Sequence, residues 1–224
     1  MRAASERVAP ADAETGGSIL DAPPLNGSKG HTTRHRLSRE VRVFVAACVV
    51  YGAMVLLFTL ISLFTAPKGS QTGTFRPVAT IPSHELLLVL LGLGLGLAIS
   101  AVRWKPDLTL LVLVPALVVL TDLDHLPSYF GLAQPIRPAH SIIFIVCTVA
   151  LMATVIRRKD VELASLSAFF AHLSIDTGVF PPFSPVSFHY YDLGEFRAAF
   201  LLAAFVFAVA AGLAVRHDRH GAVV

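Results

Sequence analysis

The chain is poor in charge and nearly free of cysteine, and each shortage excludes a class of protein. Only 15% of its 224 residues are charged, while 54% are hydrophobic, a balance that water-soluble domains do not show. The two cysteines, Cys48 and Cys147, fall inside separate apolar segments, which argues against a disulfide and for packing roles. The sequence also lacks a phosphate-binding glycine loop, a nucleophile elbow and an internal repeat. These shortages point to a membrane protein.

Long apolar segments are what the chain has in abundance. A transmembrane helix needs about 20 predominantly apolar residues, and the segments that reach or approach this length are residues 41–65, 84–102, 140–156 and 196–215. Two further segments, residues 107–126 and 161–179, are weaker because charged residues interrupt them. Together they predict an all-α membrane protein, a bundle of about six transmembrane helices.

Basic residues decide the topology, because they gather in cytoplasmic loops close to the span ends. They precede the first predicted span and follow the second, the fourth and the last, whereas the alternate loops hold only Lys68, Arg76 and Arg137. Six spans with both termini in the cytoplasm satisfy this distribution. The net charge of +3 then requires no nucleic-acid partner. The predicted location is the inner or plasma membrane, as a multi-pass protein.

The domain organisation is simple. Residues 1–33 are rich in Ala, Gly, Ser and Pro without the apolar core of a signal peptide, which predicts a disordered cytoplasmic tail. Residues 34–220 are expected to form a single transmembrane helical domain. Within it, the glycines of residues 91–98 recur at a spacing of two, which favours close helix packing over phosphate binding.

Acids and histidines collect at the ends of these spans, all on the extracytoplasmic side in this topology. They are His84, Asp122, Asp124, His125, His140, His172 and Asp176. His172 and Asp176 are four apart and share a helix face, and Asp122 and His125 do so if their helix continues that far. Mixed imidazole and carboxylate ligands suit zinc, manganese or iron better than calcium or magnesium. The pattern predicts a site for one or two divalent ions, and two ions would suit phosphoester chemistry.

Structural roles compete with this interpretation. An Asp near a helix end is often a cap and a His at the interface often snorkels, and for His84 both readings stay open. Asp122, Asp124 and Asp176 lie at outward C-terminal helix ends and are harder to explain structurally. The helix macrodipole disfavours negative charge there by about 0.3–1 kcal/mol each. Ionisable groups at membrane depth are also usually functional. His189 and Asp192, in the last loop on the same side, are further candidates.

The order of the motifs resembles the membrane-bound metal-dependent hydrolase family, which includes the LexA-regulated inner-membrane proteins of bacteria. The resemblance covers about residues 80–190 and rests on His84, then Asp122-Leu-Asp124-His125, Ala139-His140-Ser141 and His172-Leu-Ser-Ile-Asp176. Thr121 and Ala139 stand where the family usually has proline and threonine, and only Arg137 remains of its His-Arg pair. The resemblance implies a distant relation to zinc-dependent phospholipase C and to all-helical nucleases. It also implies that the seven residues are metal ligands or the base that activates water.

The sequence therefore predicts a metal-dependent hydrolase that cleaves a phosphoester or similar bond in a membrane lipid or lipid-linked substrate at the extracytoplasmic face. Zinc is the expected ion, with manganese as the alternative. Asp122 or Asp124 would act as the base, and Arg137 would hold a phosphate. The alternative is a non-enzymatic protein, either a metal or ion transporter or a structural subunit. Transporters tend to carry coupling residues near the midplane, whereas here mid-span positions are almost wholly apolar. The oligomeric state stays open.

Overall fold

Helices make up most of the computed structural model, which describes residues 29–65, 81–104, 106–130, 137–176, 179–187 and 189–220. The α-helices in these ranges are α1 (Lys29–Thr65), α2 (Ile81–Arg103), α3 (Leu108–Leu120), α4 (Leu126–Tyr129), α5 (Ile142–Val155), α6 (Lys159–Ile175) and α7 (Arg197–His220). Short 3-10 helices lie between them: η2 (Thr121–His125), η3 (Pro138–His140) and η4 (Leu193–Phe196). Two two-residue strands, β1 (Val179–Phe180) and β2 (Tyr191–Asp192), pair antiparallel.

Among the described residues, four helical stretches are long and apolar enough to cross a membrane. They are Arg39–Thr65, Ser83–Arg103, Leu108–His125 and Leu193–Ala214. Helix α5 is apolar but has only 14 residues, and α6 has 17. The predicted class, an all-α protein of membrane-spanning composition, agrees with this arrangement. The predicted fourth and fifth spans, residues 140–156 and 161–179, and the side on which the termini lie stay predictions.

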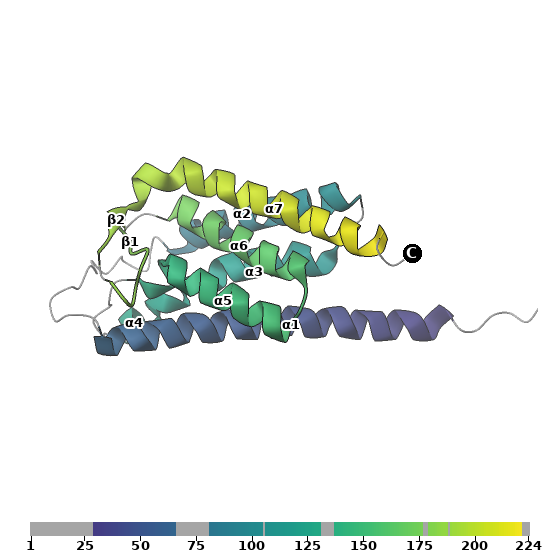
Figure 1. Cartoon of the computed structure of the whole chain (residues 1–224), viewed down its shortest axis with the longest axis horizontal. Coiled ribbons are helices and arrows are strands. Elements are labelled where there is room, and N and C mark those ends of the chain that lie inside the picture. The colour runs from purple at the N-terminus through teal and green to yellow at the C-terminus, as the bar shows by residue number, and fades with distance from the viewer. Residues whose placement is uncertain are drawn as a thin grey trace, which may run out of the picture.

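Helix α6 lies inside the bundle, between α7 and α5 (Figure 1), which explains why it is the least apolar of the predicted spans. The hydroxyl of Ser167 donates to the carbonyl of Ala204 on α7 at 2.8 Å, and that of Ser165 donates to the Val161 carbonyl at 2.8 Å. Small polar residues are tolerated in such a position because neighbouring helices supply hydrogen-bond partners. The interior position of α6 is also what carries His172 into the bundle.

Helices α2 and α3 approach so closely that side chains would not fit between them. A Cβ atom added at Gly92 would lie 2.5 Å from the Cα of Pro115, and one at Gly96 would lie 2.9 Å from the Cα of Leu111. A Cβ at Gly94 would meet nothing within 4 Å. The prediction that this glycine run serves helix packing is confirmed for Gly92 and Gly96. The close contact fixes the position of α3, whose end leads into the polar cluster.

Helix α1 is anchored to the rest of the bundle by aromatic packing and one hydrogen bond. The rings of Tyr51 and Phe58 each meet that of Phe144 on α5 edge to face, with centroids 5.5 Å apart. The hydroxyls of Tyr51 and Thr121 lie 3.0 Å apart and are buried. Edge-to-face pairs of this kind contribute about 0.5–1.5 kcal/mol beyond their buried area. Helix α1 therefore supports η2, although it lies outside the segment that resembles the hydrolase family.

A group of charged residues pairs at the α5–α6 connection. This connection lies at the end of the bundle opposite β1 and β2 (Figure 1). Arg158 donates from Nη1 to Glu40 at 2.8 Å and from Nη2 to Asp160 at 2.6 Å. Hydrogen bonds to Asp160 and, despite partial burial, the charges of both acids raise the pKa of Arg158 above its usual value. This trio, Glu40, Arg158 and Asp160, is called the charge clamp below, since it joins α1 to α6.

Two predictions about the N-terminal region and the cysteines can be compared with the structure. Helix α1 begins at Lys29, so residues 29–33 of the predicted disordered tail are helical instead, continuous with the first span. Residues 1–28 lie outside the described residues. Cys48 and Cys147 are both unpaired thiols, as their separate apolar positions predicted.

Candidate metal centre

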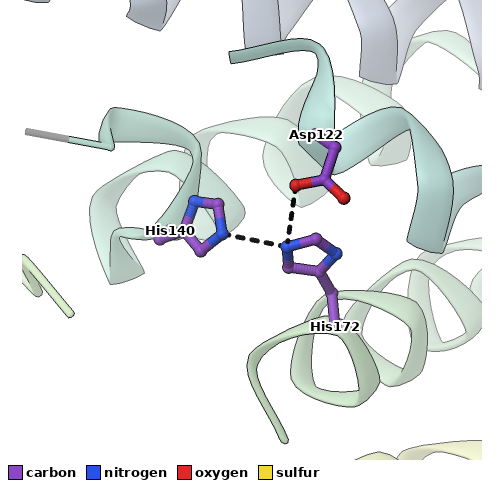
Figure 2. A group of neighbouring side chains, drawn as sticks. All are labelled: Asp122, His140 and His172. Carbon is purple, nitrogen blue, oxygen red and sulfur yellow. Dashed lines mark hydrogen bonds and ion pairs between the residues drawn. The ribbon is translucent and has the colours of Figure 1, made fainter. Parts of the chain in front are cut away.

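Side chains from three segments that are distant in sequence meet at one end of the bundle. Figure 2 shows Asp122, His140 and His172 pointing toward one another from η2, η3 and α6. His140 and His172 are fully buried, and Asp122 is largely so. The structure thus brings together seven of the predicted site residues: Asp122, Asp124, His125, Arg137, His140, His172 and Asp176.

The 3-10 helix η2 explains how the Asp-Leu-Asp-His stretch presents its side chains. The chain changes from α to 3-10 winding at Thr121, whose N–H still donates to the Leu117 carbonyl. Residues three apart eclipse one another in a 3-10 helix, and His125 Nε2 accordingly lies 3.2 Å from Asp122 Oδ1. The face that these two residues were predicted to share is confirmed, on a 3-10 turn and not on a continued α-helix.

His140 is held at the entrance of α5 by the residues on either side of it. Ser141 caps α5, its hydroxyl accepting from the Phe144 N–H at 3.0 Å. The Nδ1 atom of His140 lies 3.0 Å from Asp124 Oδ2. An ionised carboxylate can only accept hydrogen bonds, so Nδ1 of His140 carries the proton. In the neutral ring, Nε2 therefore keeps a lone pair that faces the interior. In the protonated ring, Nε2 donates instead, toward His172 Nε2 at 2.9 Å or Asp176 Oδ2 at 3.1 Å.

His172 is fixed in the same tautomer by the backbone. Its Nδ1 lies 3.0 Å from the carbonyl oxygen of Val118 on α3, and a carbonyl also only accepts. The Nε2 atoms of His140 and His172 face each other at 2.9 Å. Two lone pairs at this separation repel, so the pair requires a cation, either a proton or a metal ion, to bridge it.

Further oxygen atoms converge on the same point. Asp122 Oδ1 lies 3.6 Å from His172 Nε2, and Asp176 Oδ2 lies 3.1 Å from His140 Nε2. The ligand atoms of Asp122, His140 and His172 all lie within 4.8 Å of one another. Two histidines with one carboxylate match a catalytic zinc site that keeps an open position. Nδ1 hydrogen bonds to a carboxylate and a carbonyl are what such histidines usually make.

Two carboxylate oxygens without a hydrogen-bond donor complete this test of fit. Oδ2 of Asp122 and Oδ1 of Asp124 are buried, and within the described part of the chain neither accepts a hydrogen bond. Buried polar atoms are normally paired, and leaving a charged one unpaired costs more than leaving a neutral one. The donor set therefore fits a divalent cation, with the Asp122, His140 and His172 group as its ligands.

A second group, Asp122, Asp124 and His125, also holds its ligand atoms within 4.8 Å. Arg137 reaches into it, with Nη2 2.6 Å from His125 Nε2 and 3.2 Å from Asp122 Oδ1, while Nη1 pairs with Asp176. Burial opposes the charge on this guanidinium, but the carboxylates of Asp176, Asp124 and Asp122 outweigh it and raise the pKa of Arg137.

The remaining predicted residues lie at the edge of the cluster or elsewhere. His84 Nε2 is 3.9 Å from Asp122 Oδ2, with 23% of its side chain exposed, so it borders the site. His189 and Asp192 are exposed and have local partners. Asp192 caps η4 by accepting from the Gly194 N–H at 2.7 Å, and the ring of His189 packs against Tyr191 at 5.1 Å.

Sequence reasoning missed Glu85 as a member of the site. Its carboxyl group interacts electrostatically with Asp122 and His125. Its Oε2 atom is buried, with no hydrogen-bond partner among the described residues. The available signal was its position beside His84, which the sequence alone could equally explain as a favourable charge in the first turn of a helix.

No protein-family model, curated protein or solved structure matches the chain. The fold and the cluster define its class by themselves. It is a helical protein whose described part has four helices apolar and long enough to span a membrane. At one end it carries histidines and aspartates that could hold a metal ion.

Proposed function

We propose that the protein is a membrane-embedded, metal-dependent hydrolase that cleaves a phosphoester or similar bond in a membrane lipid or lipid-linked substrate. The observation that carries this proposal is the facing pair of Nε2 atoms of His140 and His172 at 2.9 Å. Both rings are committed at Nδ1, so both direct a lone pair at the same point. With Asp122 beside them, the favoured occupant is a metal ion and not a shared proton.

Asp122, His140 and His172 would hold the ion, zinc or manganese. When bound there, it would supply Lewis-acid chemistry that activates water and polarises a phosphoryl oxygen. Asp124 orients His140 through Oδ2, and its buried Oδ1 accepts no hydrogen bond from any described residue. We therefore favour Asp124 over Asp122 as the base that takes a proton from water, since Asp122 is a ligand. Arg137 is the candidate for a phosphate contact through its buried Nε–H, which has no hydrogen-bond partner among the described residues.

The position of the site supports a lipid-borne substrate. The cluster lies where helices end, and the loops at that end expose the apolar side chains of Phe130, Phe183 and Val186. Exposed apolar groups next to a polar site suit a substrate with acyl chains and a charged headgroup. Basic residues at the opposite end, such as Arg103 and Arg158, support a cytoplasmic location of that end, and with it an extracytoplasmic location of the site.

The first test is metal content. The full chain would be purified in mild detergent and its metal measured by elemental analysis, beside an Asp124→Ala, His172→Ala double variant and a His189→Ala control. We expect zinc or manganese in the wild type and in the control, and none in the double variant. No metal in any of the three proteins would refute the metal site.

The second test is turnover of a panel of lipid phosphoesters by the metal-loaded protein. Hydrolysis that the double variant lacks would establish the activity. Bound metal without turnover of any substrate in the panel would remove the enzymatic half of the proposal. Uptake of the same metal into proteoliposomes would then identify the alternative, a transporter.

A further inference from the structure

A guanidinium group already lies within the second group of candidate ligands. Asp122, Asp124 and His125 would by their spacing alone accept a second ion that shares Asp122 with the first. Arg137 Nη2, however, lies 2.6 Å from His125 Nε2 and 3.2 Å from Asp122 Oδ1. Because a guanidinium only donates hydrogen bonds, both of these atoms act as acceptors. Two of the three ligand atoms are therefore engaged by a cation that the chain itself supplies.

We propose that Arg137 is the second cation of this centre, so that the site binds one divalent ion and not two. The inference rests on the metal site of the proposed function, but it does not depend on what reaction the site catalyses. It assigns to Arg137 the role that a second metal ion plays in a two-metal centre, where it would neutralise the bridging carboxylate.

Charge balance supports one ion. The buried acids are Asp122, Asp124 and Asp176, and one divalent ion with one guanidinium neutralises these three negative charges. Glu85 lies at the edge of the site and is partly exposed, so water screens part of its charge although its Oε2 atom is buried. A second divalent ion added beside Arg137 would leave an excess of positive charge in a site from which water is largely excluded, which is strongly unfavourable.

Moving the Arg137 side chain out of the site would also cost free energy. Its side chain is 11% exposed, and its Nη1 pairs with Asp176, which lies 3.1 Å from His140 through the same carboxylate. Moving the guanidinium out would remove the cation that pairs with that carboxylate beside the first ligand group. Breaking a buried ion pair from one side is costly because the other charge stays buried. The guanidinium is therefore a fixed part of the centre and not a mobile substitute for a metal.

The experiment counts metal ions in the full-length protein in detergent after loading with excess Mn²⁺ and desalting. Elemental analysis gives the number of ions. Electron paramagnetic resonance distinguishes an isolated Mn²⁺ from a spin-coupled pair. The variants are Arg137→Met, which removes the charge at similar length, and Arg137→Lys, which keeps it. We expect one isolated ion in the wild type and in Arg137→Lys, and a second, spin-coupled ion in Arg137→Met.

Each outcome bears on a different statement. Two coupled ions in the wild type, or a single ion in a folded Arg137→Met protein, would overturn the role of Arg137 while leaving the metal site intact. No ion in the wild type would instead refute the proposed function, on which this inference rests. If Arg137→Met fails to fold, the wild-type spectrum still decides, because a coupled signal contradicts the proposal and an isolated one supports it.

Discussion

The two ends of the bundle each carry a cluster of charged residues, but only one of them leaves buried carboxylate oxygens without a hydrogen-bond donor among the described residues. In the charge clamp, one arginine meets two acids through direct hydrogen bonds of 2.6–3.1 Å. Its Asp160 lies in the first turn of α6, where the macrodipole favours an acid. At the other end, Asp176 caps the C-terminus of the same helix, where the macrodipole disfavours one.

This difference shows what distinguishes a site from a structural ion cluster. Burial of charge is common to both ends, since Asp160 and Asp176 are both buried. The end opposite the clamp has in addition two facing histidine nitrogens that need a proton or a metal ion between them, and two carboxylate oxygens without hydrogen-bond donors among the described residues. Acceptors without donors predict a cation, whereas matched pairs predict only stability.

The largest effect on metal affinity is expected for His172→Ala, which removes a proposed ligand from the candidate metal centre. Metal affinity should fall by more than the roughly 10–100-fold that is lost when a residue hydrogen-bonded to a ligand is removed, as measured by competition with a chelator of known affinity. His189→Ala is the matched control, because that histidine is exposed and its ring packs on Tyr191 of β2, away from the site. Equal affinities in the two variants would contradict the assigned site.

A smaller loss is expected for Asp124→Asn. The amide can still accept from His140 Nδ1, which lies 3.0 Å from the carboxylate, but it no longer carries the charge that orients and polarises the ring. Metal affinity should drop about 10–100-fold in the same competition assay. Asp160→Asn, the equivalent change in the charge clamp, should leave the affinity unchanged. A parallel loss in both variants would mean that the effect is general destabilisation.

Asp160→Ala should affect stability and not metal binding. Arg158 would keep only its bond to Glu40 at 2.8 Å. Since the arginine side chain is 21% exposed, we expect a loss of about 1–3 kcal/mol, below the range for fully buried pairs. Unfolding in mixed detergent micelles would measure it. Unchanged stability, or a lower metal affinity, would contradict the proposed difference between the two ends.

A loss of stability of similar size is expected between the ends, where α2 contacts α3. Gly92→Ala forces a methyl group against the backbone of Pro115, at a built distance of 2.5 Å, which should cost about 1–3 kcal/mol. Gly94→Ala is the control, because nothing lies within 4 Å of its added carbon. It should be neutral or stabilise by up to about 1 kcal/mol, since Ala favours helix. Thermal unfolding would measure the stability of both variants. A Gly94→Ala protein that is less stable than the Gly92→Ala protein would contradict the prediction.

The sequence predicted which residues would meet better than it predicted how they would pair. Spacing and topology brought Asp122, His125, His140 and His172 to one end, because helix periodicity and loop charge are local signals. The tautomers of His140 and His172 depend on Asp124 and on the Val118 carbonyl of α3, and such contacts cannot be read from residue types. Likewise, α6 is less apolar than a lipid-facing span since it is buried in the bundle, and burial by neighbours is a tertiary property.

The change of winding at Thr121 has a consequence for acid–base chemistry. In an α-helix each carbonyl accepts from four residues ahead, and in a 3-10 helix from three ahead. Where Thr121 still bonds to Leu117 and η2 begins, the carbonyl of Val118 is the one that this switch releases from its own helix. His172 takes it at 3.0 Å. The pitch of one helix thereby selects which nitrogen of a histidine on another helix holds the proton.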